Sequence, residues 1–177
     1  MGWFKGLFGG GGPSPEQRTQ ADHADPRKRY VFAIMSLLYE ADPAYQKKVF
    51  GVALSDWYGI ESRDELLSRM QDYLSSSGAG VAYDAFRAAF LARVGFGAGH
   101  LSEEDSWAWA LRAAQKVQAT YRNWGEYGMG FLEGHLEYWR DSGKDDEYLQ
   151  DRRQHVMAQI QARSSGLWAN TPFNLPL

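Results

Sequence analysis

Apolar residues along this chain recur at the spacing of helices packed on a core. The first such stripe follows the i, i+3, i+4, i+7 order and consists of Val31, Ile34, Met35 and Leu38. Similar stripes follow it, with expected starts near Asp42, Ser62, Tyr83, Ser102, Asn123 and Asp146. No stretch alternates between apolar and polar residues in the way that predicts a strand. The pattern therefore predicts an all-α fold, a compact single domain of about seven helices.

Capping residues indicate where several of these helices begin. The Asp42-Pro43 dipeptide has the preferred order of an N-cap followed by a first helical residue. Ser62 and Glu65 form a capping box, in which each side chain accepts from a backbone N–H of the first turn. Asn123 and Glu126 repeat this arrangement. These signals place helix starts independently of the apolar stripes.

A glycine-rich segment, Gly95–Gly99, follows the helix expected between Tyr83 and about Val94. Its glycines are spaced two apart, which invites comparison with a phosphate-binding loop. That motif also requires a preceding strand and a Lys at a fixed position, and both are missing. We therefore interpret the segment as a tight connection between helices, where glycine permits positive φ.

The two ends of the chain differ from its helical middle. Residues 9–25 are rich in glycine, proline and polar residues, which predicts a linker and a flexible N-terminal arm over residues 1–25. The helical domain then covers residues 26–177. Residues 167–177 hold too many apolar side chains for a free tail and too many prolines for a helix, so we expect a strap across the core.

The first eight residues contain Trp3, Phe4, Leu7 and Phe8. On a helix they would form one apolar face, which is typical of a membrane-surface anchor or a partner-docking peptide. The neighbouring glycines favour a tail without a membrane role. The segment also lacks the continuous apolar core of a signal peptide, so we expect a cytoplasmic protein.

Composition excludes several classes of function. The formal net charge is −3 and the basic residues are scattered, so the sequence lacks the basic patch of a nucleic-acid binder. There is no cysteine, which excludes a thiol nucleophile, thiolate-bound zinc and disulfides. Seven Trp, ten Tyr and nine Phe predict an aromatic core. We expect neither a metal nor a cofactor, because the four histidines are dispersed and Glu-x-x-His does not occur.

Several motifs resemble those of a bacterial family, the domain of unknown function 1266 family. They are Trp57-Tyr58-Gly59-Ile60, Tyr83-Asp84-x-x-Arg87, the segment 99–104, Trp124-x-Glu126-Tyr127-Gly128, Gly134-x-x-x-Tyr138-Trp139 and Ser165-Gly166-Leu167-Trp168. The chain departs from the family pattern at His100, where Tyr is expected, at His135, where Arg is expected, and at Asn123, where Ser is expected. The resemblance implies a shared architecture and a bacterial cytosolic location, but no assigned chemistry.

Few side chains stand out as candidates for binding. Asp84 and Arg87 lie three residues apart on one helical face, where they form either an anion clamp or, as we favour, a structural ion pair. Trp107 and Trp109 cannot both point inward from one helix, so one of them is expected to be exposed. We choose Trp109 as an interface anchor, because aromatic side chains dominate binding hot spots.

These observations favour a non-enzymatic module that binds another protein. The most concrete version is an immunity-type protein that blocks a toxin or effector enzyme, and an adaptor is the broader version. The alternative is an enzyme or small-ligand binder with a cleft around Asp84, Arg87, His100 and Glu126. No residue is assigned a catalytic role, since no nucleophile, base and orienting group can be assembled.

Overall fold

The computed structural model describes residues 12–177, and within this range the chain forms eight α-helices and no strand. The helices are α1 (Pro15–Asp22), α2 (Pro26–Met35), α3 (Lys47–Val52), α4 (Arg63–Ser75), α5 (Val81–Gly97), α6 (Glu103–Thr120), α7 (Trp124–Asp141) and α8 (Asp146–Ser164). Three short helical turns accompany them, namely the 3-10 turns η1 (Pro43–Tyr45) and η3 (Gly78–Gly80) and the π-helical turn η2 (Ala53–Trp57). The predicted all-α fold is confirmed.

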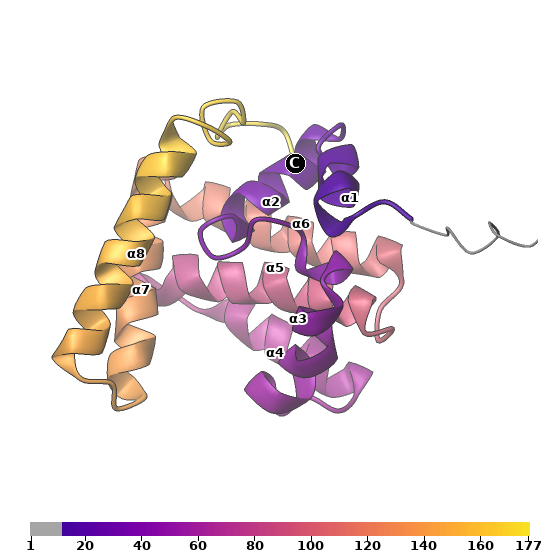
Figure 1. Cartoon of the computed structure of the whole chain (residues 1–177), viewed down its shortest axis with the longest axis horizontal. Coiled ribbons are helices and arrows are strands. Elements are labelled where there is room, and N and C mark those ends of the chain that lie inside the picture. The colour runs from indigo at the N-terminus through magenta and orange to yellow at the C-terminus, as the bar shows by residue number, and fades with distance from the viewer. Residues whose placement is uncertain (1–11) are drawn as a thin grey trace, which may run out of the picture.

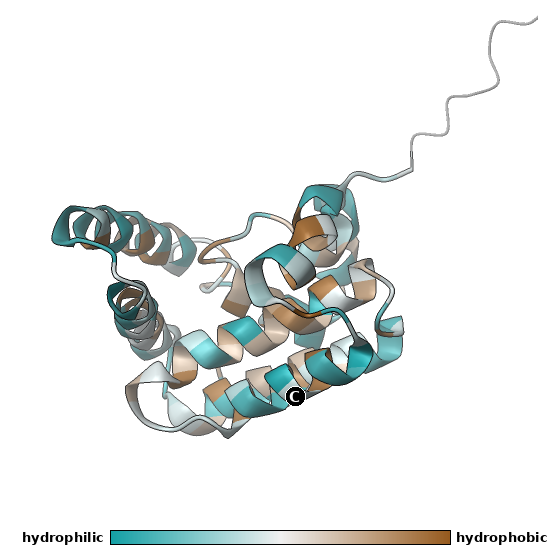
Figure 2. Cartoon of the chain, turned by 90° about the horizontal axis from the view of Figure 1, so that it is seen from below, coloured by the Kyte–Doolittle hydropathy of each residue, from teal (hydrophilic) through white to brown (hydrophobic). Residues whose placement is uncertain are grey.

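Helix α5 is the centre of the domain. Thirteen of its 17 residues are buried, so it is apolar nearly all round, as expected of a helix enclosed by others. It packs against α4, α6 and α7, and α7 pairs with α8. In Figure 1, α5 and α6 run side by side while α7 and α8 cross one end of them. Helix α8 buries only Leu149 and Val156, and its surface is largely hydrophilic (Figure 2).

The additional helix is α1, which lies within the stretch predicted as a linker. Ser14 and Gln17 form a capping box at its start. The Thr19 hydroxyl accepts a hydrogen bond from the backbone N–H of Asp42, at 2.8 Å, and the Tyr45 hydroxyl donates to Asp22, at 2.6 Å. The linker prediction is therefore wrong for residues 15–22. They form a capped helix, and contacts with a distant part of the chain hold this helix in place. The predictions for residues 1–8 lie outside the described residues.

Helix α5 continues to Gly97, so the predicted helix end near Val94 is wrong. Gly95 and Gly97 allow close packing instead of breaking the helix. A Cβ on Gly95 would lie 2.5 Å from the Leu66 side chain, and a Cβ on Gly97 would lie 2.7 Å from the Ala44 carbonyl oxygen. Only Gly99, with φ of 84°, takes the positive φ that was expected of the segment.

The predicted C-terminal strap is confirmed. The indole Nε1 of Trp124 donates to the carbonyl oxygen of Thr171, at 2.7 Å, and the indole Nε1 of Trp168 donates to that of Ala33, at 3.0 Å. The Gln118 amide donates to two further carbonyl oxygens of the strap, those of Phe173 and Leu175. The chain end thus returns over α2 and α6 (Figure 1).

A buried ion pair joins the loop before η1 to helix α5. Arg93 Nε donates to the Asp42 carboxylate at 2.7 Å, and both side chains are almost fully buried. Arg93 Nη1 donates to the Ser106 hydroxyl of α6, and the guanidinium lies 3.6 Å from the centroid of the Trp107 ring. Asp42 also accepts from the N–H of Ala44, as the N-cap prediction required. Sequence analysis did not single out Arg93, since its partners are distant along the chain.

Replacing Asp42 by Ala is expected to lower the free energy of unfolding by about 3–5 kcal/mol, because a buried guanidinium would lose its counter-charge. Urea unfolding measures this change. Arg63→Ala is the matched control, since Arg63 pairs with Asp105 on the surface and should contribute less than about 1 kcal/mol. Equal effects of the two substitutions would contradict the assignment.

Candidate functional site

An aromatic cavity of 430 Å³ lies between the loop after α2, the turn η2 and helices α5 and α7. All but one of its lining side chains are aromatic or imidazole rings. The lining consists of Leu38, Tyr39, Trp57, Tyr58, Tyr83, Phe86, His135, Tyr138 and Trp139. We refer to this feature as the aromatic cavity.

Close approach of α5 and α7 forms one wall of the aromatic cavity. A Cβ on Gly134 would lie only 2.9 Å from the Cβ of Tyr83, so glycine lets the two helices meet at this point. His135 and Tyr138 follow on α7 and face the rings of α5. The Tyr83 ring centroid lies 5.1 Å from that of His135 and 5.6 Å from that of Tyr138. The wall is therefore a set of rings in mutual contact.

The turn η2 supplies the opposite rim. Its π-helical backbone ends at Trp57, and Gly59 with φ of 62° then turns the chain back. Trp57 remains 53% exposed although its ring stacks near Phe90, with 6.4 Å between the centroids. Single π-helical turns are frequent at functional sites, where they alter the direction of a side chain.

Asp84 and Arg87 form a salt bridge on α5, at the i, i+3 spacing. The Arg87 guanidinium lies 4.1, 4.7 and 5.3 Å from the ring centroids of Tyr73, Tyr83 and Tyr138, respectively. Two of these rings line the aromatic cavity, and neither member of the ion pair does. The pair thus contacts the cavity wall from behind, and its structural interpretation stays a prediction.

Two other predicted site residues lie elsewhere. His100 follows the end of α5, on the order of 20 Å along the helix from Asp84, and lines a separate cavity of 420 Å³. The Glu126 carboxylate accepts from the backbone N–H of Arg122, so it acts at the start of α7. Asp84, Arg87, His100 and Glu126 therefore do not meet in a common cleft.

Trp109 is half-buried and its ring packs under a guanidinium. The Arg112 Cζ lies 4.0 Å from the ring centroid. Trp107 of the same helix is buried, as the spacing of the two indoles required. Trp57 is more exposed than Trp109, and sequence reasoning passed over it as a core residue. Gly59, two residues after Trp57, was the sequence signal that the helix ends close to this indole.

Three ring nitrogens on the α7 wall have no hydrogen-bond partner among the described residues. They are Nδ1 and Nε2 of His135 and Nε1 of Trp139. Burial, together with the nearby charges of Arg152 and His155, lowers the pKa of His135 to about 4. Its imidazole is thus neutral at pH 7. The i, i+3, i+4 spacing of His135, Tyr138 and Trp139 is visible in the sequence, but there it indicates only a helix face, core aromatics and a family motif.

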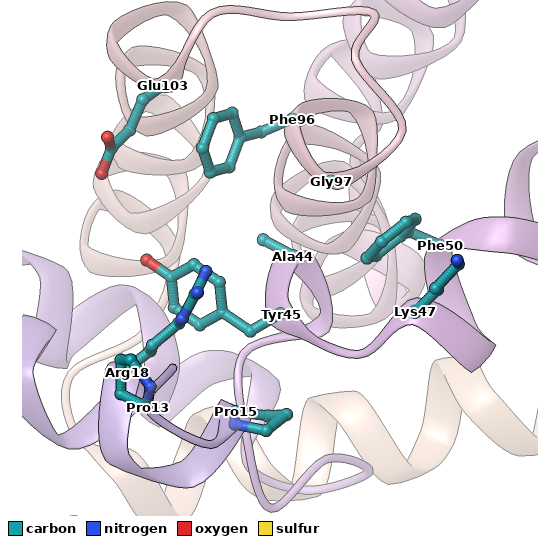
Figure 3. Close-up of a pocket in the computed structure, with 10 residues that line it drawn as sticks. All are labelled: Pro13, Pro15, Arg18, Ala44, Tyr45, Lys47, Phe50, Phe96, Gly97 and Glu103. Carbon is teal, nitrogen blue, oxygen red and sulfur yellow. The ribbon is translucent and has the colours of Figure 1, made fainter. Parts of the chain in front are cut away.

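A second cavity, of 540 Å³, lies between α1, η1 and the neighbouring ends of α5 and α6 (Figure 3). Three of its polar side chains already have partners. The Tyr45 hydroxyl donates to Asp22, the Arg18 guanidinium lies over the Tyr45 ring, and Glu103 lies 3.9 Å from the Lys28 ammonium. No buried polar atom of its described lining lacks a partner, so the aromatic cavity is the stronger candidate.

Comparison with known proteins gives the chain a family. The family model described as a protein of unknown function (DUF1266) matches residues 76–173. The chain belongs to the DUF1266 family. This DUF1266 chain matches no curated protein and no solved structure. The matched range includes α5 to α8, and therefore the wall of the aromatic cavity, whereas Tyr39, Trp57 and Tyr58 lie outside it.

No helix formed by residues 12–177 is both long and apolar enough to span a bilayer. Within the same residues, no three His, Asp or Glu side chains gather in a way that would hold a metal ion.

The low pKa of His135 predicts a loss of stability in mild acid. The unfolded chain takes up a proton near pH 6.5, whereas the folded chain does so only near pH 4. Between these values the unfolded state binds more protons, so the free energy of unfolding should fall by about 3 kcal/mol as the pH decreases. Urea unfolding at several pH values measures this slope. His135→Phe should flatten it, whereas the exposed His155→Gln should leave most of it, because burial is the larger cause of the low pKa. Identical slopes in all three proteins would contradict the prediction.

Arg87→Met is expected to lower the free energy of unfolding by about 1–2 kcal/mol, because three aromatic rings lose a partly buried cation. The matched control is Arg112→Met, which removes a guanidinium from a single ring at an exposed position. Chemical denaturation compares the two. A loss for Arg112→Met as large as that for Arg87→Met would show that burial among the tyrosines adds nothing.

Proposed function

We propose that this protein is a binding module that recognises a partner protein through the aromatic cavity and its exposed rim. The observation that carries the proposal is the exposure of Trp57 and Tyr138, at 53% and 39%, on either side of a hollow lined by rings. Tryptophan and tyrosine are enriched in the centres of protein interfaces, where they fill or surround pockets. An exposed aromatic pair beside a preformed cavity matches this arrangement.

The chemistry of the lining supports binding over catalysis. No Asp, Glu, Lys, Arg, Ser or Thr lines the aromatic cavity, and His135 is its one imidazole. Burial raises the pKa values of the Tyr39 and Tyr83 phenols above their ordinary range, so both remain protonated at neutral pH. A set of neutral rings offers contact area and a few hydrogen bonds, and these are the properties of a recognition site.

The narrower proposal is an immunity-type protein of the bacterial cytoplasm, which would cover a toxin or effector with this surface. Two features support it. The net charge of −3 favours a basic partner. The exposed rings can anchor a partner protein without any catalytic group. This proposal moves the predicted anchor from Trp109 to Trp57.

The test is affinity capture with four variants of the full-length chain. Trp57→Ala and Tyr138→Ala should each reduce recovery of a stoichiometric partner by about tenfold, as expected for hot-spot residues. Trp109→Ala is the matched control for the loss of an indole, and Met157→Ala removes an exposed apolar side chain from α8. Both controls should retain the partner. Circular dichroism and thermal melting confirm that each variant is folded.

Loss of the partner from Trp109→Ala together with full recovery by Trp57→Ala would place the interface on α6 and refute this proposal. Equal recovery by all four variants would also refute it.

A further inference from the structure

We propose that the aromatic cavity receives one neutral, planar aromatic side chain that carries a hydrogen-bonding group, namely a tyrosine or tryptophan of the partner protein. This inference rests on the proposed function and names the group that would occupy its central pocket. The shape of the cavity, its charge and its unpartnered polar atoms support it.

The shape of the aromatic cavity favours a flat ring. Its walls are rings that already meet in stacked and edge-to-face pairs, such as Tyr83 against Phe86 and His135 against Tyr83. An additional ring can continue this pattern, because aromatic groups prefer offset or perpendicular contacts with one another. The volume of 430 Å³ lies toward the lower end of the range of ligand pockets, and it suits a side chain with its flanking backbone.

The charges around the aromatic cavity favour a neutral occupant. No charged side chain lines it, so an ion placed inside would lose its hydration without gaining a counter-charge. The Arg87 guanidinium lies over the Tyr83 and Tyr138 rings, and Arg152 lies near His135. These positive charges further disfavour a cationic occupant. Asp84 is paired with Arg87 and does not line the cavity.

The hydrogen-bonding capacity of the α7 wall is unused. His135 is 4% exposed, and neither of its nitrogens has a partner in residues 12–177. Buried polar groups of this kind are nearly always hydrogen-bonded in folded proteins, so the His135 imidazole has capacity for a further partner. A neutral imidazole has one donor and one acceptor. A phenol hydroxyl can meet either, and an indole N–H can meet the acceptor, whereas a phenylalanine or leucine side chain can meet neither.

The first experiment titrates the full-length protein with side-chain analogues. The probes are p-cresol for tyrosine, skatole for tryptophan, toluene for phenylalanine, cyclohexylmethanol as a non-planar alcohol and benzylamine as a cation. The readout is the chemical shift of the Trp57 and Trp139 indole N–H groups, assigned by substitution of each. We expect p-cresol and skatole to shift both signals with Kd values on the order of 1 mM, as suits fragments of this size. Cyclohexylmethanol and benzylamine should bind at least fivefold more weakly.

The second experiment tests His135 as the hydrogen-bonding group. In the unmodified protein, p-cresol should bind about fivefold more tightly than toluene, which corresponds to one net hydrogen bond. In His135→Phe the wall keeps its ring but loses both nitrogens, so this difference should disappear. His155→Gln, on the exposed side of α8, should leave it unchanged.

Several results would overturn the inference. Equal binding of toluene and p-cresol would do so, as would stronger binding of benzylamine than of p-cresol, or shifts that avoid both indoles. Micromolar binding of free skatole or p-cresol would identify a small-molecule site and would overturn the assignment to a partner's side chain. The proposed function fails separately, since it depends on the capture of a partner by Trp57 and Tyr138. If Trp57→Ala lowers capture of the partner but no analogue binds, the interface is supported and the proposed aromatic occupant is refuted.

Discussion

The buried pair of Asp42 and Arg93 fixes the part of the chain on which the rest of the structure depends. A guanidinium is almost never buried without a counter-charge, so the apolar environment of α5 requires Asp42 at this position. The same residue caps η1, and its backbone N–H binds Thr19 of α1, while Arg93 reaches Ser106 of α6. Elements from four places in the sequence thus meet at one ion pair, and none of them can shift alone without exposing a buried charge.

This constraint also positions the rim of the aromatic cavity. The segment after Asp42 leads through η1 and α3 to η2, and it is held a second time where Ala44 and Phe50 pack on Gly97. Because the glycine allows such close contact, α3 lies against the end of α5 and the following π-helical turn carries Trp57 toward Phe90. The exposed indole is therefore attached to a segment fixed at two points. An aromatic group held in this way loses little conformational freedom when a partner binds, which favours affinity.

Features that depend on local interactions could be predicted from the sequence. Helix starts with capping boxes, such as Ser62 with Glu65, were found because both members lie within one turn. The end of α5 was missed because the partners of Gly95 and Gly97 are Leu66, Phe50 and Ala44, which only the fold brings close. The aromatic cavity was missed for the same reason, since its lining comes from four separate stretches of sequence. The Asp84 and Arg87 pair was found from its spacing, but its position behind the tyrosines required the structure.

The DUF1266 family model covers one side of the aromatic cavity and not the other. The matched residues, 76–173, contain the wall formed by α5 and α7 and the Asp84 and Arg87 pair that supports it. Trp57 lies outside this range, so the family model contains no information on that side of the rim, whereas Tyr138 on the other side lies within it. The matched part of the fold therefore includes the residues that hold the rings of the wall in contact, namely Gly134 and Arg87. In the proposed function, the choice of partner depends equally on Trp57, and hence on the segment that the buried ion pair holds in place.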